Sequence, residues 1–161
     1  MNKKLYQIRL SKARRFAQKI GRLPYVKMVA LIGSMANGKA NNNSDIDFFI
    51  QTAPKRIWTA RFFILLWLLI LGERPTSQNK AGKICLSWWA DFDVFKKKRI
   101  KHQILFEKKA EITDYNEGIF EKALKFIQIA MIKNSKYNIR KGAFVRVRRH
   151  EIVLHGVLTD K

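Results

Sequence analysis

Residues 29–50 read VALIGSMANGKANNNSDIDFFI, and the interpretation of the whole chain starts from this stretch. An apolar run ends at Gly33-Ser34, a polar segment rich in asparagine follows, and Asp45-Ile46-Asp47 opens a second apolar run. Short apolar runs bounded by glycine and asparagine are typical of buried strands. The stretch therefore predicts a strand over 25–32, a short helical turn from Ser34 to about Gly38, a loop, and a second strand over 45–51.

The two aspartates at the start of the second strand predict a metal site. Residues two apart on a strand point to the same face, so the carboxylates of Asp45 and Asp47 should lie side by side. Like charges that close repel and raise each other's pKa, and a bound divalent cation removes this penalty. Mg²⁺ prefers oxygen ligands and keeps water and phosphate oxygens in its shell. We therefore expect Mg²⁺ at Asp45 and Asp47, with a nucleotide completing its coordination.

The Gly33-Ser34 turn is expected to hold phosphates. Glycine lets the backbone approach a phosphate closely and tolerates a positive φ. Ser34 adds a hydroxyl and a backbone N–H, and a helix that starts just after it favours an anion at that point. Together with the aspartate pair, Gly33 and Ser34 predict binding of a nucleoside triphosphate with Mg²⁺.

Gly33-Ser34, the downstream Gly38 and the run Ser44-Asp45-Ile46-Asp47-Phe48 resemble the signature of the nucleotidyltransferase fold of the DNA polymerase beta superfamily. They are most similar to its small prokaryotic branch, the minimal nucleotidyltransferase-like domains. The resemblance implies an α/β (α+β) fold with a small mixed β-sheet flanked by helices and a helical C-terminal part. It also implies transfer of a nucleoside monophosphate from an NTP such as ATP to an acceptor hydroxyl, with Mg²⁺.

The same resemblance implies a third carboxylate, from a later strand, that orients or deprotonates the attacking hydroxyl. Asp91 is the candidate for this catalytic role, and Asp93 is the alternative. Both share the parity of Cys85 on an ideal strand, but both lie at the end of the strand predicted over 83–90 rather than in its middle. This departs from the pattern of the family. If neither residue reaches the pair, we expect a domain that binds nucleotide without efficient transfer.

Apolar periodicity and breakers such as Pro24, Pro54 and Gly72 predict the remaining elements. Helices are expected over 3–22, 57–71, 100–109 and 115–133, and a basic hairpin or terminal strand over 143–161. The 57–71 helix is expected to be a buried core helix, with a helix at a membrane interface as the alternative. The 115–133 helix is expected to follow a capping box that starts at Asp114. Its predicted apolar face consists of Ile119, Phe120, Ala123, Leu124, Ile127, Ala130 and Met131.

Length and composition favour one domain over residues 1–161, with the nucleotidyltransferase core at about 25–95 and a basic extension over 96–161. The net charge of +21 favours a polyanion such as RNA, DNA or anionic lipid, although a basic host proteome is an alternative explanation. Trp88-Trp89 is expected to pack the sheet against a helix, with stacking on nucleic-acid bases as the alternative.

Cys85 is the only cysteine, which excludes a disulfide within the chain and predicts a reducing compartment, hence a cytoplasmic location. We expect Cys85 to be a core residue rather than a nucleophile, and no zinc-ligand spacing is present. The N-terminus does not have the pattern of a signal peptide. The most apolar run, residues 62–71, is too short to span a bilayer, so no membrane span is expected.

The function expected first is Mg²⁺-dependent nucleotidyl transfer to a small molecule, a protein side chain or an RNA 3′ end. A second hypothesis, from the same resemblance, is an antitoxin-like regulatory partner of a helical toxin. A third is a catalytically weak, basic RNA-binding domain on the same scaffold. The sequence does not distinguish the nucleotide or the acceptor.

Overall fold

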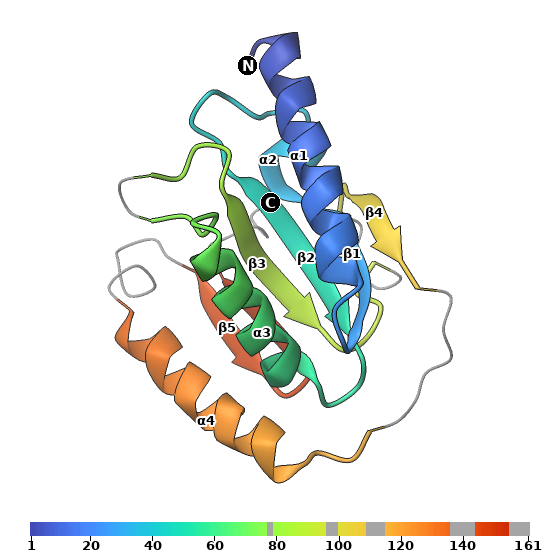
Figure 1. Cartoon of the computed structure of the whole chain (residues 1–161), viewed down its shortest axis with the longest axis vertical. Helices are drawn as coiled ribbons and strands as arrows, with labels where there is room; N and C mark the ends of the chain where they lie inside the picture. The colour runs from blue at the N-terminus through green and yellow to red at the C-terminus, as the bar shows by residue number, and fades with distance from the viewer. Residues whose placement is uncertain (77–78, 96–99, 109–114, 136–143, 155–161) are drawn as a thin grey trace.

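The structure is a computed structural model that describes residues 1–76, 79–95, 100–108, 115–135 and 144–154. Within these ranges, a six-stranded sheet carries the long helices on one face (Figure 1). The strands are β1 (Val26–Leu31), β2 (Ile46–Thr52), β3 (Ile84–Ala90), β4 (Gln103–Glu107), β5 (Val145–Arg148) and β6 (Glu151–Leu154). The helices are α1 (Lys3–Gly21), α2 (Gly33–Ala36), α3 (Ile57–Ile70) and α4 (Ile119–Asn134).

The sheet is mixed, and its strand order is β4-β1-β2-β3-β6-β5. β2 and β3 run parallel with α3 as the crossover between them, and the other neighbouring pairs are antiparallel. Because β1 and β2 are antiparallel, the start of β2 lies beside the end of β1 and also beside the start of β3. This arrangement confirms the expected fold class of a mixed sheet flanked by helices.

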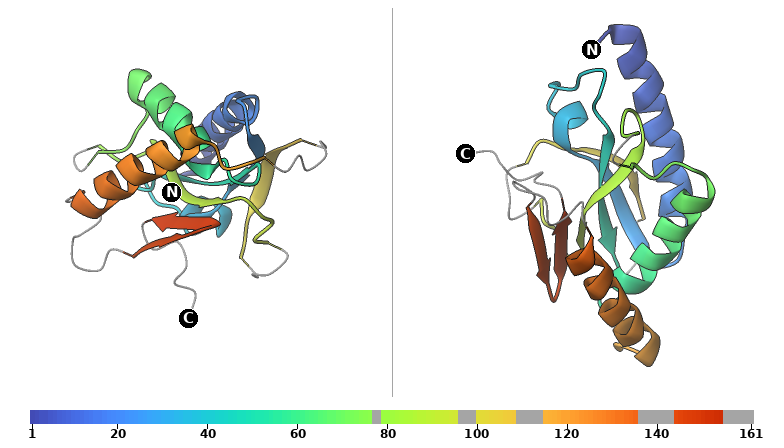
Figure 2. Two further views of the ribbon diagram at one scale, coloured as in Figure 1. Left: turned by 90° about the horizontal axis from the view of Figure 1, so that it is seen from below. Right: turned by 90° about the vertical axis from the view of Figure 1, so that its left-hand side faces the viewer.

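The two faces of the sheet are covered by different parts of the chain (Figure 2). α1 packs on β1 and β4 and α3 packs on β3, and this packing buries a core that includes Phe16, Phe48 and Ile64. On the opposite face, Phe95 from the segment after β3 packs edge-on against Phe49. Asp47 alternates with Phe48 along β2 and therefore belongs to this second face.

Trp88 and Trp89 are fully buried, each with 0% of its surface exposed. Trp89 belongs to the core beneath the helices, whereas Trp88 packs on the second face and donates from Nε1 to Glu151 Oε1 at 3.0 Å. The alternative that this pair stacks on nucleic-acid bases is wrong, because neither ring is accessible to a base.

The helix predicted over 100–109 is wrong, because residues 103–107 form the edge strand β4. β4 pairs with β1 from Met28↔Glu107 to Leu31↔Gln103 and satisfies backbone groups that would otherwise lie unpaired at the edge of the sheet. The ring of Phe106 packs so closely on Gly21 of α1 that a Cβ there would lie 2.1 Å from it. These tertiary contacts outweigh the weak helical pattern of the segment.

The hairpin alternative for the C-terminal segment is confirmed between β5 and β6, which extend the sheet beyond β3. Residues 155–161 of that segment lie outside the described residues. Within the residues that the structure describes, no helix is both long enough and apolar enough to cross a membrane.

α4 begins at Ile119 after the cap residue Gly118, four residues later than predicted, and Asp114 of the expected capping box lies outside the described residues. The buried side of α4 consists of two apolar residues, Leu124 and Ile132, and two polar residues, Glu121 and Gln128. Glu121 accepts hydrogen bonds from the backbone N–H groups of Trp58 at 2.8 Å and Thr59 at 2.9 Å. These N–H groups have no acceptor within α3, so the buried carboxylate acts as a cap supplied by another helix.

The apolar face predicted for α4 is also wrong, because only Leu124 of that set is buried. Gln128 faces α3 instead, accepting from Arg61 Nη1 at 2.6 Å and donating to the carbonyl of Trp58 at 2.8 Å. Because the start of α3 and the buried Arg61 require acceptors, Glu121 and Gln128 face inward together with Leu124 and Ile132, and most of the apolar stripe of α4 faces solvent. The exposed members are Ile119, Phe120, Phe126, Ile127 and Met131.

α3 is not the fully buried helix that its composition predicts. One side buries Ile57, Ile64 and Leu68, whereas the opposite side exposes Phe62, Phe63, Leu66, Leu69 and Ile70. α3 and α4 therefore both present apolar side chains to the outside.

Candidate functional site

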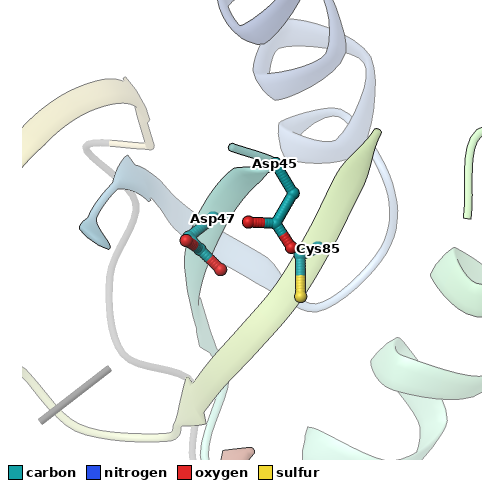
Figure 3. A group of neighbouring side chains, drawn as sticks. All are labelled: Asp45, Asp47 and Cys85. Atoms are coloured by element: carbon teal, nitrogen blue, oxygen red, sulfur yellow. The ribbon is translucent and has the colours of Figure 1, made fainter. Parts of the chain in front are cut away.

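Asp45 and Asp47 lie where the start of β2 meets the end of β1 and the start of β3 (Figure 3). The backbone N–H of Ile32 donates to the carbonyl of Asp47 at 3.0 Å, and Asp47 faces Cys85 on β3. Asp45 directly precedes β2, which begins at Ile46. One oxygen from each carboxylate and Cys85 Sγ all lie within 4.8 Å of one another. The structure thus brings the two predicted aspartates together and adds a thiol to them.

Gly33 lies directly against the carboxylate of Asp47. Its φ is +68°, in the left-handed region, and a Cβ at this position would lie 2.5 Å from Asp47 Oδ2. Both constraints require glycine. α2 begins here and is only one turn long, and the carbonyl of Ser34 accepts from Lys39 N at 2.9 Å to close the connection. The predicted Gly33-Ser34 turn therefore borders the aspartate pair.

Ser87 lies two residues after Cys85 on β3 and therefore faces Asp47 as well, next to a bulge in the strand. The register passes from Phe48↔Leu86 to Phe49↔Trp88, which leaves Ser87 as an extra residue on β3. Ser87 Oγ donates to Asp47 Oδ1 and also lies 3.4 Å from Cys85 Sγ. Ser87 is fully buried, so solvent does not reach the site from the side of β3 at this residue.

Burial and mutual repulsion act against negative charge at the aspartate pair. Burial raises the pKa of Asp47 to about 7, the charge of Asp45 adds to the rise, and hydrogen bonds from Ser87 and Cys85 oppose it. Burial also raises the pKa of Asp45, although Lys80 and Arg9 lower it in part. Burial, followed by the two aspartates, raises the pKa of the Cys85 thiol well above its usual value. A divalent cation at the carboxylates would relieve this strain.

Arg9 holds the loop that precedes the aspartates. It is 7% exposed and donates from Nη1 to the carbonyl of Asn41 at 2.8 Å and from Nη2 to that of Asn42 at 2.5 Å. Sequence reasoning missed this role. The available signal was the position of Arg9 on the otherwise apolar face of α1, four residues after Leu5 and four before Ala13.

The placement expected for Asp91 is wrong. Ala90 pairs with Gln51, four residues along β2 from Asp47, so Asp91 lies beyond it, on the order of 15 Å from the pair at about 3.3 Å per residue. Its carboxylate accepts from Lys55 N at 3.2 Å and lies 3.0 Å from His150 Nδ1, at the turn of the β5–β6 hairpin. Distance along the strand, and not the face on which its side chain lies, separates Asp91 from the pair.

Asp93 does not belong to the aspartate site either. It follows β3 and accepts from Phe95 N at 3.0 Å, which closes a local turn. Cys85 and Ser87 instead occupy the part of β3 that faces Asp47. Their spacing of two on the predicted strand indicates that both side chains lie on one face. Neither was expected in the place of the third carboxylate, because neither residue is an acid.

The donor set suits a hard divalent cation. The carboxylate oxygens of the two aspartates match the ligand preference of Mg²⁺. The thiol is a soft ligand that suits other metals. The residues that would hold such an ion are Asp45 and Asp47, and Cys85 lies next to them without being a ligand that Mg²⁺ prefers.

Replacing Gly33 should disable the site, and Gly38 offers a matched control. Gly33→Ala is expected to weaken Mn²⁺ binding at least tenfold, since the new methyl group displaces the Asp47 carboxylate. Gly38 also has a positive φ, of +72°, but a Cβ there meets nothing within 4 Å. Gly38→Ala should therefore cost stability without weakening binding. Calorimetric Mn²⁺ titration of both variants tests this, and equal losses would contradict it.

The metal-free protein should lose stability as the pH rises from about 4 to about 7. Because folding raises the pKa of Asp47 from 3.8 to about 7, the native state binds more protons than the unfolded state in this window. Stability is then highest at the acidic end, with a fall on the order of 3 kcal/mol between pH 4 and pH 7. Urea unfolding at a series of pH values in EDTA measures the free energy of unfolding of the metal-free protein. Asp47→Asn should flatten the profile, whereas Asp93→Asn should leave it in place, and an unchanged slope in Asp47→Asn would refute the assignment.

Comparison with known proteins agrees with this geometry. The family model described as "Nucleotidyltransferase domain" matches residues 10–138, which includes α1 from Leu10 onward, the aspartate site, α3 and all of α4. No curated protein and no solved structure matches the chain. On the strength of the family match, which covers well over half of its length, the chain belongs to the nucleotidyltransferase domain family.

Proposed function

We propose that the chain binds a nucleoside triphosphate with Mg²⁺ at Asp45 and Asp47 and transfers the nucleoside monophosphate to an acceptor hydroxyl. The observation that carries this proposal is the convergence of Asp45, Asp47 and Gly33 at the junction of β1, β2 and β3. Two carboxylates whose pKa values are raised by burial favour a cation, and the absence of a side chain at Gly33 lets the Asp47 carboxylate lie directly against the backbone of the Gly33-Ser34 turn.

The residues of the site have separate roles in this proposal. Asp45 and Asp47 hold the ion, which when bound neutralises phosphate charge and polarises the reacting phosphoryl group. Gly33 and Ser34 position the β- and γ-phosphates beside it. Arg9 keeps the 39–43 loop in place, and Ser87 fixes the orientation of the Asp47 carboxylate. Catalysis then consists mainly of positioning and electrostatic stabilisation.

A polyanionic acceptor such as RNA suits the charge of the chain. The net charge is +21, and α1 exposes Lys3, Lys4, Arg14, Arg15 and Lys19 without an acidic residue among its own positions. α1 is also tied to the site, because Arg9 contacts the loop that precedes Asp45. Phosphate contacts from such cations position a nucleic acid without reading its sequence.

Label transfer tests the proposal directly. The protein is incubated with each of the four α-labelled NTPs and Mg²⁺, alone and with total cellular RNA. Transfer is expected to fall at least a hundredfold in Asp45→Asn and in Asp47→Asn, because each removes a metal ligand. Asp91→Asn, at the far end of β3, should keep most of the activity.

The controls separate catalysis from binding. RNA binding measured by filter retention should be unchanged in the two metal-ligand variants. RNA binding without transfer in the wild type would instead favour a catalytically weak RNA-binding domain on the same scaffold. Activity lost equally in Asp91→Asn would contradict the assignment of the site.

A second candidate function is an antitoxin-like partner of a helical protein. The observation that favours it is the pair of solvent-facing apolar stripes, with Phe62, Leu66 and Ile70 on α3 and Phe126 and Met131 on α4. Exposed apolar areas of this kind commonly mark sites of protein interaction. A partner helix could lay its apolar face on these stripes, in the same way that helices pack against each other in protein cores.

Surface variants test this candidate. We expect Phe126→Lys with Met131→Lys to abolish co-purification of a partner from the native host and to keep the melting temperature, since both side chains are exposed by more than half. Lys122→Ala and Lys133→Ala on the same helix serve as controls that should retain the partner. Light scattering on the purified chain reveals whether a second copy covers the stripes instead, which would contradict the candidate.

A further inference from the structure

Cys85 and Ser87 stand where β3 faces the metal-binding aspartates. Cys85 is the register partner of Asp47, and Ser87 Oγ donates to Asp47 Oδ1. A third carboxylate for this site would have to project from this part of β3, because no other strand borders the start of β2 on that side. The chain places a thiol and a hydroxyl there.

The acidic residues after β3 do not replace the missing carboxylate. Asp91 is held at the opposite end of the strand by Lys55 N and His150, and Asp93 caps its own turn by accepting from Phe95 N. Within the described part of the chain, the group of metal-competent side chains at the site consists of Asp45, Asp47 and Cys85.

We propose, on the premise that the proposed function is correct, that this site holds a single divalent ion, because the residues that the structure describes supply no ligand for a second ion on the side of the acceptor hydroxyl. Asp45, Asp47 and the phosphate oxygens of the nucleotide complete one oxygen shell. Two-metal sites clamp the attacking and the leaving oxygens with ions roughly 3.5–4 Å apart. Even where two carboxylates bridge both ions, the ion on the side of the attacking oxygen needs at least one further oxygen ligand from the protein to be held as firmly as the ion that also binds the phosphates.

The ligands for a second ion are not available on β3. Mg²⁺ takes oxygen ligands in near-octahedral geometry, and a buried thiol does not supply one. The Ser87 hydroxyl is engaged with Asp47 and carries no charge. The acceptor hydroxyl therefore meets neither a metal ion nor a carboxylate at Cys85, and the chain binds nucleotide better than it transfers it.

The geometry also identifies the position that restores the missing ligand. Cys85 Sγ already lies within 4.8 Å of an oxygen from each aspartate. Aspartate is close to cysteine in reach, so Cys85→Asp places a third carboxylate beside the other two. Cys85→Asn has nearly the same shape without the charge and is the matched control.

Electron paramagnetic resonance of Mn²⁺ counts the ions at the site. The full chain is mixed with Mn²⁺ and a non-hydrolysable NTP analogue. The wild type and Cys85→Asn should give the six-line signal of an isolated ion at one Mn²⁺ per complex. Cys85→Asp should bind two ions per complex and show the spin coupling of a close pair. Label transfer by Cys85→Asp with Mg²⁺ should also rise at least tenfold over the wild type.

Each outcome decides the inference. A coupled Mn²⁺ pair in the wild type overturns it, and so does a single uncoupled ion in a folded Cys85→Asp protein. If Cys85→Asp does not fold, as judged by circular dichroism, the wild-type spectrum and Ser87→Asp decide in its place. Absence of any Mn²⁺–nucleotide complex in the wild type refutes the proposed function itself, which is a different result from finding two ions.

Discussion

Repulsion between two partly buried carboxylates is the constraint on which the site depends. Asp45 and Asp47 lie close enough to raise the pKa of Asp47 to about 7 in the metal-free protein, because burial and the neighbouring charge act in the same direction. Hydrogen bonds from Ser87 and Cys85 offset only part of this cost. A cation would neutralise such a pair, and this is the physical basis of the proposed metal–nucleotide site.

The surrounding structure supports this pair at several points. Gly33 contributes no side chain, so the Asp47 carboxylate can lie against its backbone, and Ser87 donates a hydrogen bond to the same carboxylate. Arg9 reaches across from α1 to hold the loop before Asp45. Elements distant in sequence thus determine one arrangement of two side chains, and the thiol of Cys85 limits what that arrangement can bind.

The α3–α4 contact shows a second way in which polar groups direct the fold. Glu121 and Gln128 supply hydrogen-bond acceptors that α3 lacks. Glu121 accepts from N–H groups at the start of α3, and Gln128 accepts from the buried guanidinium of Arg61. An unmet buried hydrogen-bonding group costs more than an exposed apolar side chain. The apolar stripes of both helices therefore remain on the outside, where a partner can cover them.

Local sequence was sufficient for the centre of the molecule. The alternation of apolar runs with Gly33-Ser34 and Asp45-Ile46-Asp47 predicted β1, α2, β2 and the aspartate pair, because these features depend on strand periodicity and on turn chemistry within a short stretch. Tertiary structure alone decided the rest. β4 is a strand because β1 offered it an open edge, α4 is rotated because α3 needed acceptors, and Asp91 lies far from the pair because it follows the far end of β3, where Lys55 N and His150 contact its carboxylate. Each of these three features depends on hydrogen-bond partners from a distant segment. The periodicity of one segment does not predict such partners.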